Sequence, residues 1–156
     1  MKKKFISSII VVVIVTIIAV SVYFVSIEIN KSHDKGFEWI TSGPISVQNY
    51  QHRLGENIFI VAYGIKPTEK GVIRIFTPNN TEYINYPFDG SVKSNFNVYF
   101  KPDTQPFKDR CSPKDLVGIW TVKLEGVPYP PIQFELINEY VIGGEADIVD
   151  ICQYLK

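Results

Sequence analysis

The sequence is poor in the side chains that most often build metal centres. Its 156 residues contain two histidines, two cysteines and one methionine, Met1. Blue copper in a β-sandwich needs two His, a Cys and usually an axial Met, and no histidine follows either cysteine. Structural zinc needs ligands at close spacing, which neither cysteine has. The sequence therefore predicts no copper or zinc cofactor.

Catalytic motifs and an excess of basic residues are missing as well. The chain has no Gly-x-Ser-x-Gly, no His-Glu-x-x-His and no phosphate-binding glycine loop. His33 and His52 are poorly placed for a Ser-His or Cys-His pair. Sixteen Lys and Arg balance sixteen Asp and Glu, whereas nucleic-acid binders usually carry a basic excess. We expect neither an enzyme nor a nucleic-acid-binding protein.

Loop carboxylates leave calcium open as an alternative. Glu145, Asp147 and Asp150 lie in the tail, and Asp103 and Asp109 flank a loop that contains prolines. Exported sandwiches can bind calcium through such carboxylates, but neither stretch has the ligand order of an EF-hand. The simpler interpretation is a solvated acidic surface.

The most conspicuous feature that is present is a long apolar run near the N-terminus. Residues 5–27 contain no charged side chain, and Lys2, Lys3 and Lys4 precede them. As a helix, this run would span roughly 35 Å, enough for a hydrocarbon core of about 30 Å. We expect residues 1–4 in the cytoplasm, a transmembrane signal-anchor helix over 5–27 that contacts the lipid bilayer, and the rest of the chain exported.

A cleaved signal peptide is the alternative, because Ala19-Val20-Ser21 is an acceptable cleavage site. The apolar run continues past that site to Ile27, which is longer than a usual signal core and favours the anchor. Both interpretations export the remainder. Residues 28–156 carry 13 basic and 16 acidic groups, a net charge of −3.

The cysteines are compatible with export. Cys111 and Cys152 both follow the apolar run, and a lone pair outside the cytoplasm tends to be oxidised. A disulfide that closes this separation would stabilise the fold by roughly 4 kcal/mol. Two unpaired buried thiols are the alternative, because a sequence cannot show the geometry. Asn30 and Asn79 begin the two Asn-x-Ser/Thr sequons and are the glycosylation candidates.

Beyond a juxtamembrane linker over residues 28–44, the dominant period is two. Trp120, Val122 and Leu124 alternate with polar residues, as a half-buried strand requires. Two more continuously apolar runs, 58–63 and 72–76, suggest central strands that are covered on both faces. Turn residues separate the predicted strands, which lie near 45–49, 57–64, 72–77, 82–87, 92–100, 118–125 and 132–138. Residues 45–156 are thus predicted to be an all-β domain, an antiparallel β-sandwich with a C-terminal tail.

Residues 45–138 resemble the immunoglobulin-like sandwich domains of exported, membrane-anchored archaeal and bacterial surface proteins. The resemblance rests on 55–60, 64–67, 72–78 and the Gly-x-Trp-x-Val-x-x-x-Gly strand from Gly118 to Gly126. The chain departs from antibody domains, because it has no cysteines on facing strands and no Tyr-x-Cys near the end. The resemblance implies an adhesion, spacer or partner-binding module without catalytic residues.

The expected function follows from these features. We expect a single-pass protein of the cell membrane whose extracytoplasmic immunoglobulin-like module binds a protein partner or supports the envelope. An accessory subunit of an integral membrane complex is the alternative, and an exported enzyme comes last. Exposed aromatic residues favour protein or sugar contacts. Tyr99, on the polar face of the 92–100 strand, is the candidate surface contact, whereas Trp120 is expected in the core.

Overall fold

The computed structural model describes Ile17 and residues 38–105, 110–145 and 148–154. Apart from Ile17, the predicted membrane span lies outside these residues, and so does Asn30. In the described part of the chain, we find no helix with the length and apolar character needed to cross a membrane. The chain divides into two compact units, Met1–Gly36 and Phe37–Lys156, and every described strand belongs to the second.

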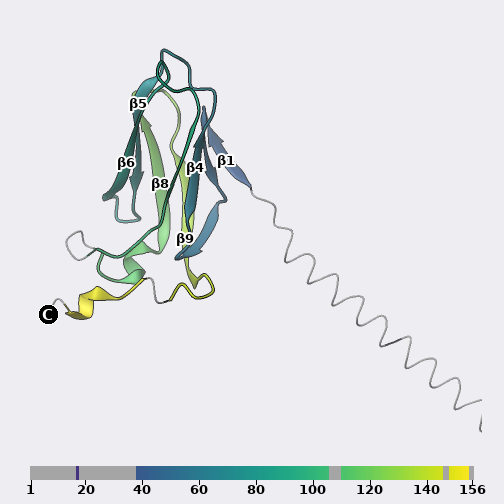
Figure 1. Cartoon of the computed structure of the whole chain (residues 1–156). Helices are drawn as coiled ribbons and strands as arrows, with labels where there is room; N and C mark the ends of the chain where they lie inside the picture. Colours follow the sequence, from purple (N-terminus) through teal and green to yellow (C-terminus); the bar gives the residue numbers. More distant parts are fainter. Residues whose placement is uncertain (1–16, 18–37, 106–109, 146–147, 155–156) are drawn as a thin grey trace, which may run out of the picture. The chain divides into compact units, whose positions relative to one another are not determined.

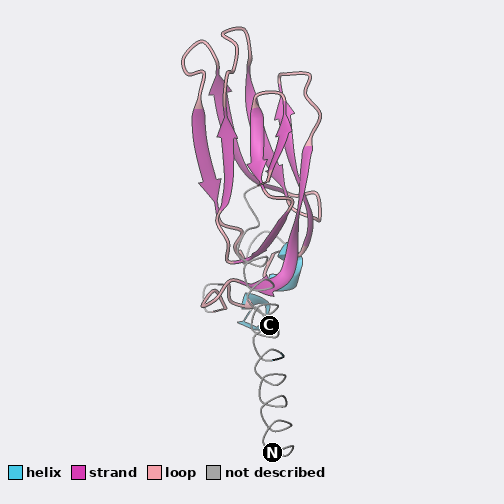
Figure 2. Ribbon diagram, turned by 90° about the vertical axis from the view of Figure 1, so that its right-hand side faces the viewer, coloured by secondary structure: helices cyan, strands magenta, loops and turns pink. Residues whose placement is uncertain are grey.

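The second unit is an all-β fold with two sheets, which confirms the all-β part of the predicted fold class (Figure 1). The four-stranded sheet has the order β1 (Trp39–Ser42), β2 (Ile45–Gln48), β4 (Ile58–Ala62) and β7 (Phe96–Phe100). The five-stranded sheet has the order β3 (Gln51–Leu54), β9 (Ile132–Tyr140), β8 (Gly118–Glu125), β5 (Lys70–Phe76) and β6 (Glu82–Asp89). Two short 3₁₀ helices, η1 (Pro113–Leu116) and η2 (Ile151–Tyr154), lie at one end of the sandwich (Figure 2).

The prediction that all strands pair antiparallel is wrong for one pair. β3 pairs parallel with β9, with Gln51 opposite Glu135 and Arg53 opposite Ile137. Only two residues separate β3 from β2, and the first of them, Asn49, has a φ of 54°. The chain changes sheets at this short break instead of forming a hairpin. Strands that switch sheets in this way are a known means of closing a sandwich corner.

Two strands were not predicted, and one predicted strand begins later than expected. β1 occupies residues that were assigned to the linker, and β3, with the sequence Gln-His-Arg-Leu, was not predicted. β7 begins at Phe96 instead of residue 92, because residues 89–93 form a turn in which Asp89 Oδ1 accepts hydrogen bonds from the Ser91 backbone N–H and hydroxyl. The alternation over 92–95 therefore reflects turn residues and not a strand.

The core lies between the two sheets and centres on Trp120. This side chain is fully buried, as predicted, and its ring stacks on Phe134 of β9 at a centroid distance of 6.0 Å. Phe100 of the opposite sheet lies 6.1 Å from the Trp120 ring. The indole N–H donates to the Leu116 carbonyl at 2.7 Å, so its polar group is satisfied inside the core. One aromatic cluster thus joins both sheets.

Two tyrosine hydroxyls bridge the edge strands β6 and β7. The Tyr83 hydroxyl donates to the Lys101 carbonyl at 2.8 Å, and the Tyr86 hydroxyl donates to the Tyr99 carbonyl at 3.3 Å. The Tyr83 oxygen also accepts the Asp103 backbone N–H at 3.1 Å. The edges of the two sheets are therefore connected by side chains on this side of the sandwich.

Candidate functional site: an aromatic outer face

The outer face of the four-stranded sheet carries a row of aromatic side chains. Phe59 of β4 is directly opposite Tyr99 of β7, and Trp39 of β1 is opposite Gln48 of β2. Val47 pairs with Ile60, so the same register places Gln48 beside Phe59. Since paired residues share a face of a sheet, these four side chains form one cross-strand row.

The aromatic members of this row are open to solvent. Tyr99 is 65% exposed, Trp39 is 44% exposed and Phe59 is 39% exposed. The Phe59 and Tyr99 rings contact each other at a centroid distance of 5.8 Å. Exposed aromatic residues that gather in one row are uncommon on a surface that has no partner. Tyr99 is the contact residue predicted from the sequence, and Trp39 and Phe59 lie on the same face.

This outer face has no charged side chain within its four strands. Beside the aromatic row, the second cross-strand row consists of Thr41, Ser46, Val61 and Asn97. The Thr41 and Ser46 hydroxyls are 2.8 Å apart and share a hydrogen bond. We call this surface, residues 39, 41, 46, 48, 59, 61, 97 and 99, the aromatic face.

The outer face of the five-stranded sheet is built from charges instead. Arg74 lies 2.6 Å from both Glu82 and Glu125, and these carboxylates raise its pKa, Glu125 most strongly. Gln51 donates to Glu135 at 2.9 Å. Surface networks of this kind contribute little to stability but keep a face hydrated. We call this surface, which carries residues 51, 74, 82, 119, 123, 125 and 135, the charged face.

His52, the only described histidine, has a structural position. It is 1% exposed and its ring packs edge-on against Phe134 at 5.5 Å. Its Nε2 lies 2.6 Å from the Gln48 carbonyl and its Nδ1 lies 2.9 Å from Glu56 Oε1. Burial opposes ionisation of Glu56, but the hydrogen bonds from His52 and the Arg53 backbone lower its pKa overall. Both ring nitrogens are engaged, so His52 has no free nitrogen to act as a base.

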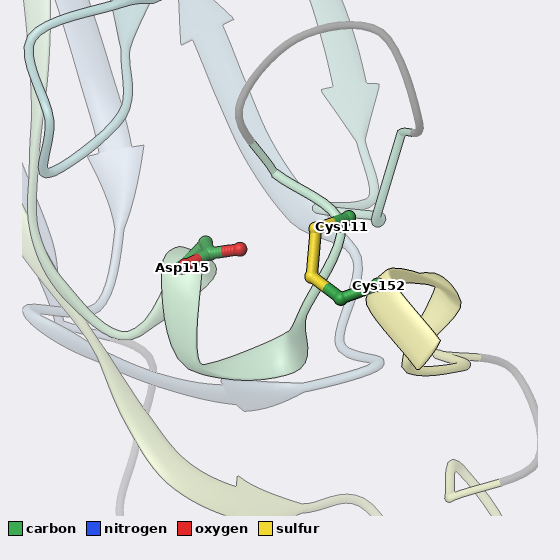
Figure 3. A group of neighbouring side chains, drawn as sticks. All are labelled: Cys111, Asp115 and Cys152. Carbon is green, nitrogen blue, oxygen red and sulfur yellow. A yellow bond between two sulfur atoms is a disulfide. The ribbon is translucent and has the colours of Figure 1, made fainter. Parts of the chain in front are cut away.

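The two cysteines form the predicted disulfide, with Cα atoms 4.8 Å apart (Figure 3). It joins the segment before η1 to η2, and the backbone N–H groups of Ile151 and Cys152 both donate to the Cys111 carbonyl. Asp115 is near the sulfur atoms, but its carboxylate accepts the Ser112 backbone N–H at 2.9 Å. Because both sulfurs are in the disulfide, this group of residues is not a metal-binding thiolate cluster.

The remaining predicted sites differ in how much the structure says of them. Asn79 is exposed in the turn between β5 and β6, so its glycosylation stays a prediction at an accessible position. A shallow groove of about 420 Å³ lies where β6 passes into β7 and is lined by Pro87, Phe88, Asp89, Val92, Lys93 and Phe96. Asp89 in this groove is already bound by Lys70 at 2.8 Å.

Sequence reasoning missed Trp39, Phe59 and one buried charge. Phe59 lies in an apolar run that was interpreted as covered on both faces, yet β4 is covered on one face only. Arg110 is 1% exposed, and no sequence signal distinguishes it from a surface arginine. Comparisons of the chain with protein-family models and with curated proteins found no match.

Proposed function

We propose that this protein is a membrane-anchored, extracytoplasmic immunoglobulin-like module that binds a protein partner at the cell envelope through the aromatic face, without catalysis. The observation that carries the proposal is the exposed row of Trp39, Phe59 and Tyr99 on a surface without charge. The centres of protein interfaces are depleted in charged residues and enriched in aromatic ones. Trp and Tyr are also the residues that most often dominate binding energy.

The location in this proposal is supported by the sequence and by the disulfide. An apolar run of 23 residues behind three lysines favours an anchored N-terminus in the cytoplasm. Disulfides persist mainly in oxidising compartments, and Cys111 and Cys152 are joined. The immunoglobulin-like assignment is supported by two facing sheets with a buried Trp in a central strand.

A protein partner fits this surface better than a sugar. Aromatic platforms for sugars are usually combined with polar groups that hydrogen-bond hydroxyls. Here the polar neighbours are Thr41, Ser46, Gln48 and Asn97. The Thr41 and Ser46 hydroxyls bond to each other, and Gln48 is only 8% exposed. An uncharged aromatic surface instead matches the apolar centre of a protein interface.

The test is partner capture by the full-length chain from native membranes in mild detergent, with variants of both faces. Tyr99→Ser and Phe59→Ser should reduce capture by at least about tenfold. Ile119→Ser is the matched control, since Ile119 is 41% exposed on the charged face. Equal capture by all variants would contradict binding through the aromatic face.

The alternative function, an accessory subunit of a membrane complex, predicts a different result in the same experiment. A chain that comigrates with a stoichiometric membrane complex even when both aromatic residues are replaced would be an accessory subunit held by its N-terminal segment. Sedimentation of the purified chain checks for self-association. A dimer that Tyr99→Ser dissociates would replace the separate partner with a second copy.

A further inference from the structure

Arg110 is a buried cation with unused hydrogen-bond donors. Its side chain is 1% exposed, and its Nε and Nη1 atoms have no hydrogen-bond partner in the described part of the protein. Its Nη2 donates to Gln105 Oε1 at 3.2 Å. Buried polar groups are almost always hydrogen-bonded, so unpaired donors on a charged group need an explanation.

Among the described residues, three carboxylates in neighbouring segments accept hydrogen bonds from other groups. Asp103 accepts the Thr104 backbone N–H, and Asp115 accepts that of Ser112. Asp150 accepts hydrogen bonds from the Ser112 hydroxyl and the Cys152 backbone N–H. No ion pair joins Arg110 to any described carboxylate. Burial lowers the pKa of Arg110, as expected for a charge without a counter-ion.

The surroundings of the guanidinium restrict how a ligand can meet it. The Tyr83 ring covers one face, with its centroid 4.5 Å from the Arg110 Cζ atom. The N–H bonds of a guanidinium lie in its plane, so a hydrogen-bond acceptor meets them there and not through the Tyr83 ring. A carboxylate is planar and accepts such bonds in its own plane. Gln105 and Tyr83, the two side chains that contact the guanidinium, are both partly exposed.

We propose that Arg110 forms an anion site that takes a small carboxylate, with Tyr83 as the stacking wall and Gln105 as the side chain that moves aside. This site is separate from the aromatic face and does not depend on the proposed function. The bound carboxylate would supply the acceptors that Nε and Nη1 lack in the described protein.

The chain offers an internal control, because it has only three arginines. Arg53 and Arg74 have Nε atoms paired with Glu139 at 3.4 Å and Glu125 at 2.6 Å. The experiment titrates sodium acetate into the ¹⁵N-labelled full-length chain in nonionic detergent and follows the three Nε–H resonances by NMR. Single Arg→Lys variants assign them.

We expect the Arg110 resonance to shift to saturation while those of Arg53 and Arg74 do not move. A stationary Arg110 resonance, or three that move together with ionic strength, would overturn the proposal. Saturation by sulfate but not by acetate would overturn the carboxylate assignment.

Thermal unfolding gives a second readout. Acetate should raise the wild-type midpoint above that in sodium chloride of equal ionic strength, and Arg53→Met should keep this difference. Arg110→Met should abolish it, and Arg110→Lys should raise the acetate concentration required by about tenfold, because Lys lacks the planar donors. If Arg110→Met does not fold, the NMR titration of the wild type with acetate still tests whether Arg110 binds the carboxylate.

Discussion

The outer faces of the two sheets differ in composition: one is aromatic and uncharged, and the other is charged. The aromatic face presents Trp39, Phe59 and Tyr99 without a charge in its four strands. The charged face presents Arg74 between two glutamates. Both sheets contribute to one core, so the difference lies only in the residues that alternate outward.

Folding restricts the inward positions of the strands much more than the outward ones. Inward positions on both sheets must be apolar, because they fill one core. Outward positions tolerate either composition, and a face with charges is the more soluble choice. The uncharged aromatic face is therefore the surface through which we propose contact with another molecule.

The largest expected effect is common to both sheets. Trp120→Ala should lower the free energy of unfolding by about 3–5 kcal/mol, because the indole packs against aromatic rings from each sheet. Trp39 is then the only tryptophan left, so its fluorescence reports the four-stranded sheet alone. Urea unfolding followed by Trp39 fluorescence and by circular dichroism should coincide. Two separate transitions would show that the sheets are not one cooperative unit.

The next effect concerns the end of the sandwich where the tail is attached. Cys111→Ser with Cys152→Ser should lower the free energy of unfolding by about 4 kcal/mol, through the greater entropy of the unfolded chain. Partner capture through the aromatic face should be unchanged. The measurement is urea unfolding of both proteins, with non-reducing mass spectrometry of the wild type as the control. Two free thiols in the wild type would contradict the bond.

Acid should weaken the fold through groups outside the aromatic face. Lys70 and Ser91 lower the pKa of Asp89 to about 2, and hydrogen bonds from Tyr129 and the Lys66 backbone lower that of Glu69. Because these two pKa values are lower in the folded protein, the ionised carboxylates stabilise the fold at pH values above the ordinary carboxyl pKa. This stabilisation is lost as the pH falls, and for Asp89 the loss is complete near pH 2. Urea midpoints between pH 6 and 2 should fall, and less steeply for Asp89→Asn. An unchanged slope in that variant would remove Asp89 from the explanation.

The smallest expected effect on stability is at the aromatic face itself. Tyr99→Ser should change the free energy of unfolding by about 0.5–1 kcal/mol, since it removes one cross-strand ring contact. The same variant should have the largest effect on partner capture. Urea unfolding beside capture measures both. A loss of several kcal/mol would mean that the face belongs to the core of the fold.

The sequence supported the fold more fully than the site. Alternation at Trp120 and Leu124 identified inward positions, since period two is a direct consequence of strand geometry. Phe59 escaped prediction because an unbroken apolar run does not reveal which face is covered. Arg110 escaped because its environment is set by Tyr83 and Gln105 together, a tertiary arrangement that no local pattern encodes.

The tyrosine bridges between β6 and β7 have a consequence for how this protein meets others. An edge strand with free carbonyls invites another chain to extend the sheet, which leads to polymers. The carbonyls of Tyr99 in β7 and of Lys101, one residue after β7, already accept hydrogen bonds from tyrosine hydroxyls of β6. A strand added at this edge would first have to displace both tyrosines. At this edge, the side chains of the aromatic face are thus more accessible to the partner that we propose than the β7 backbone is.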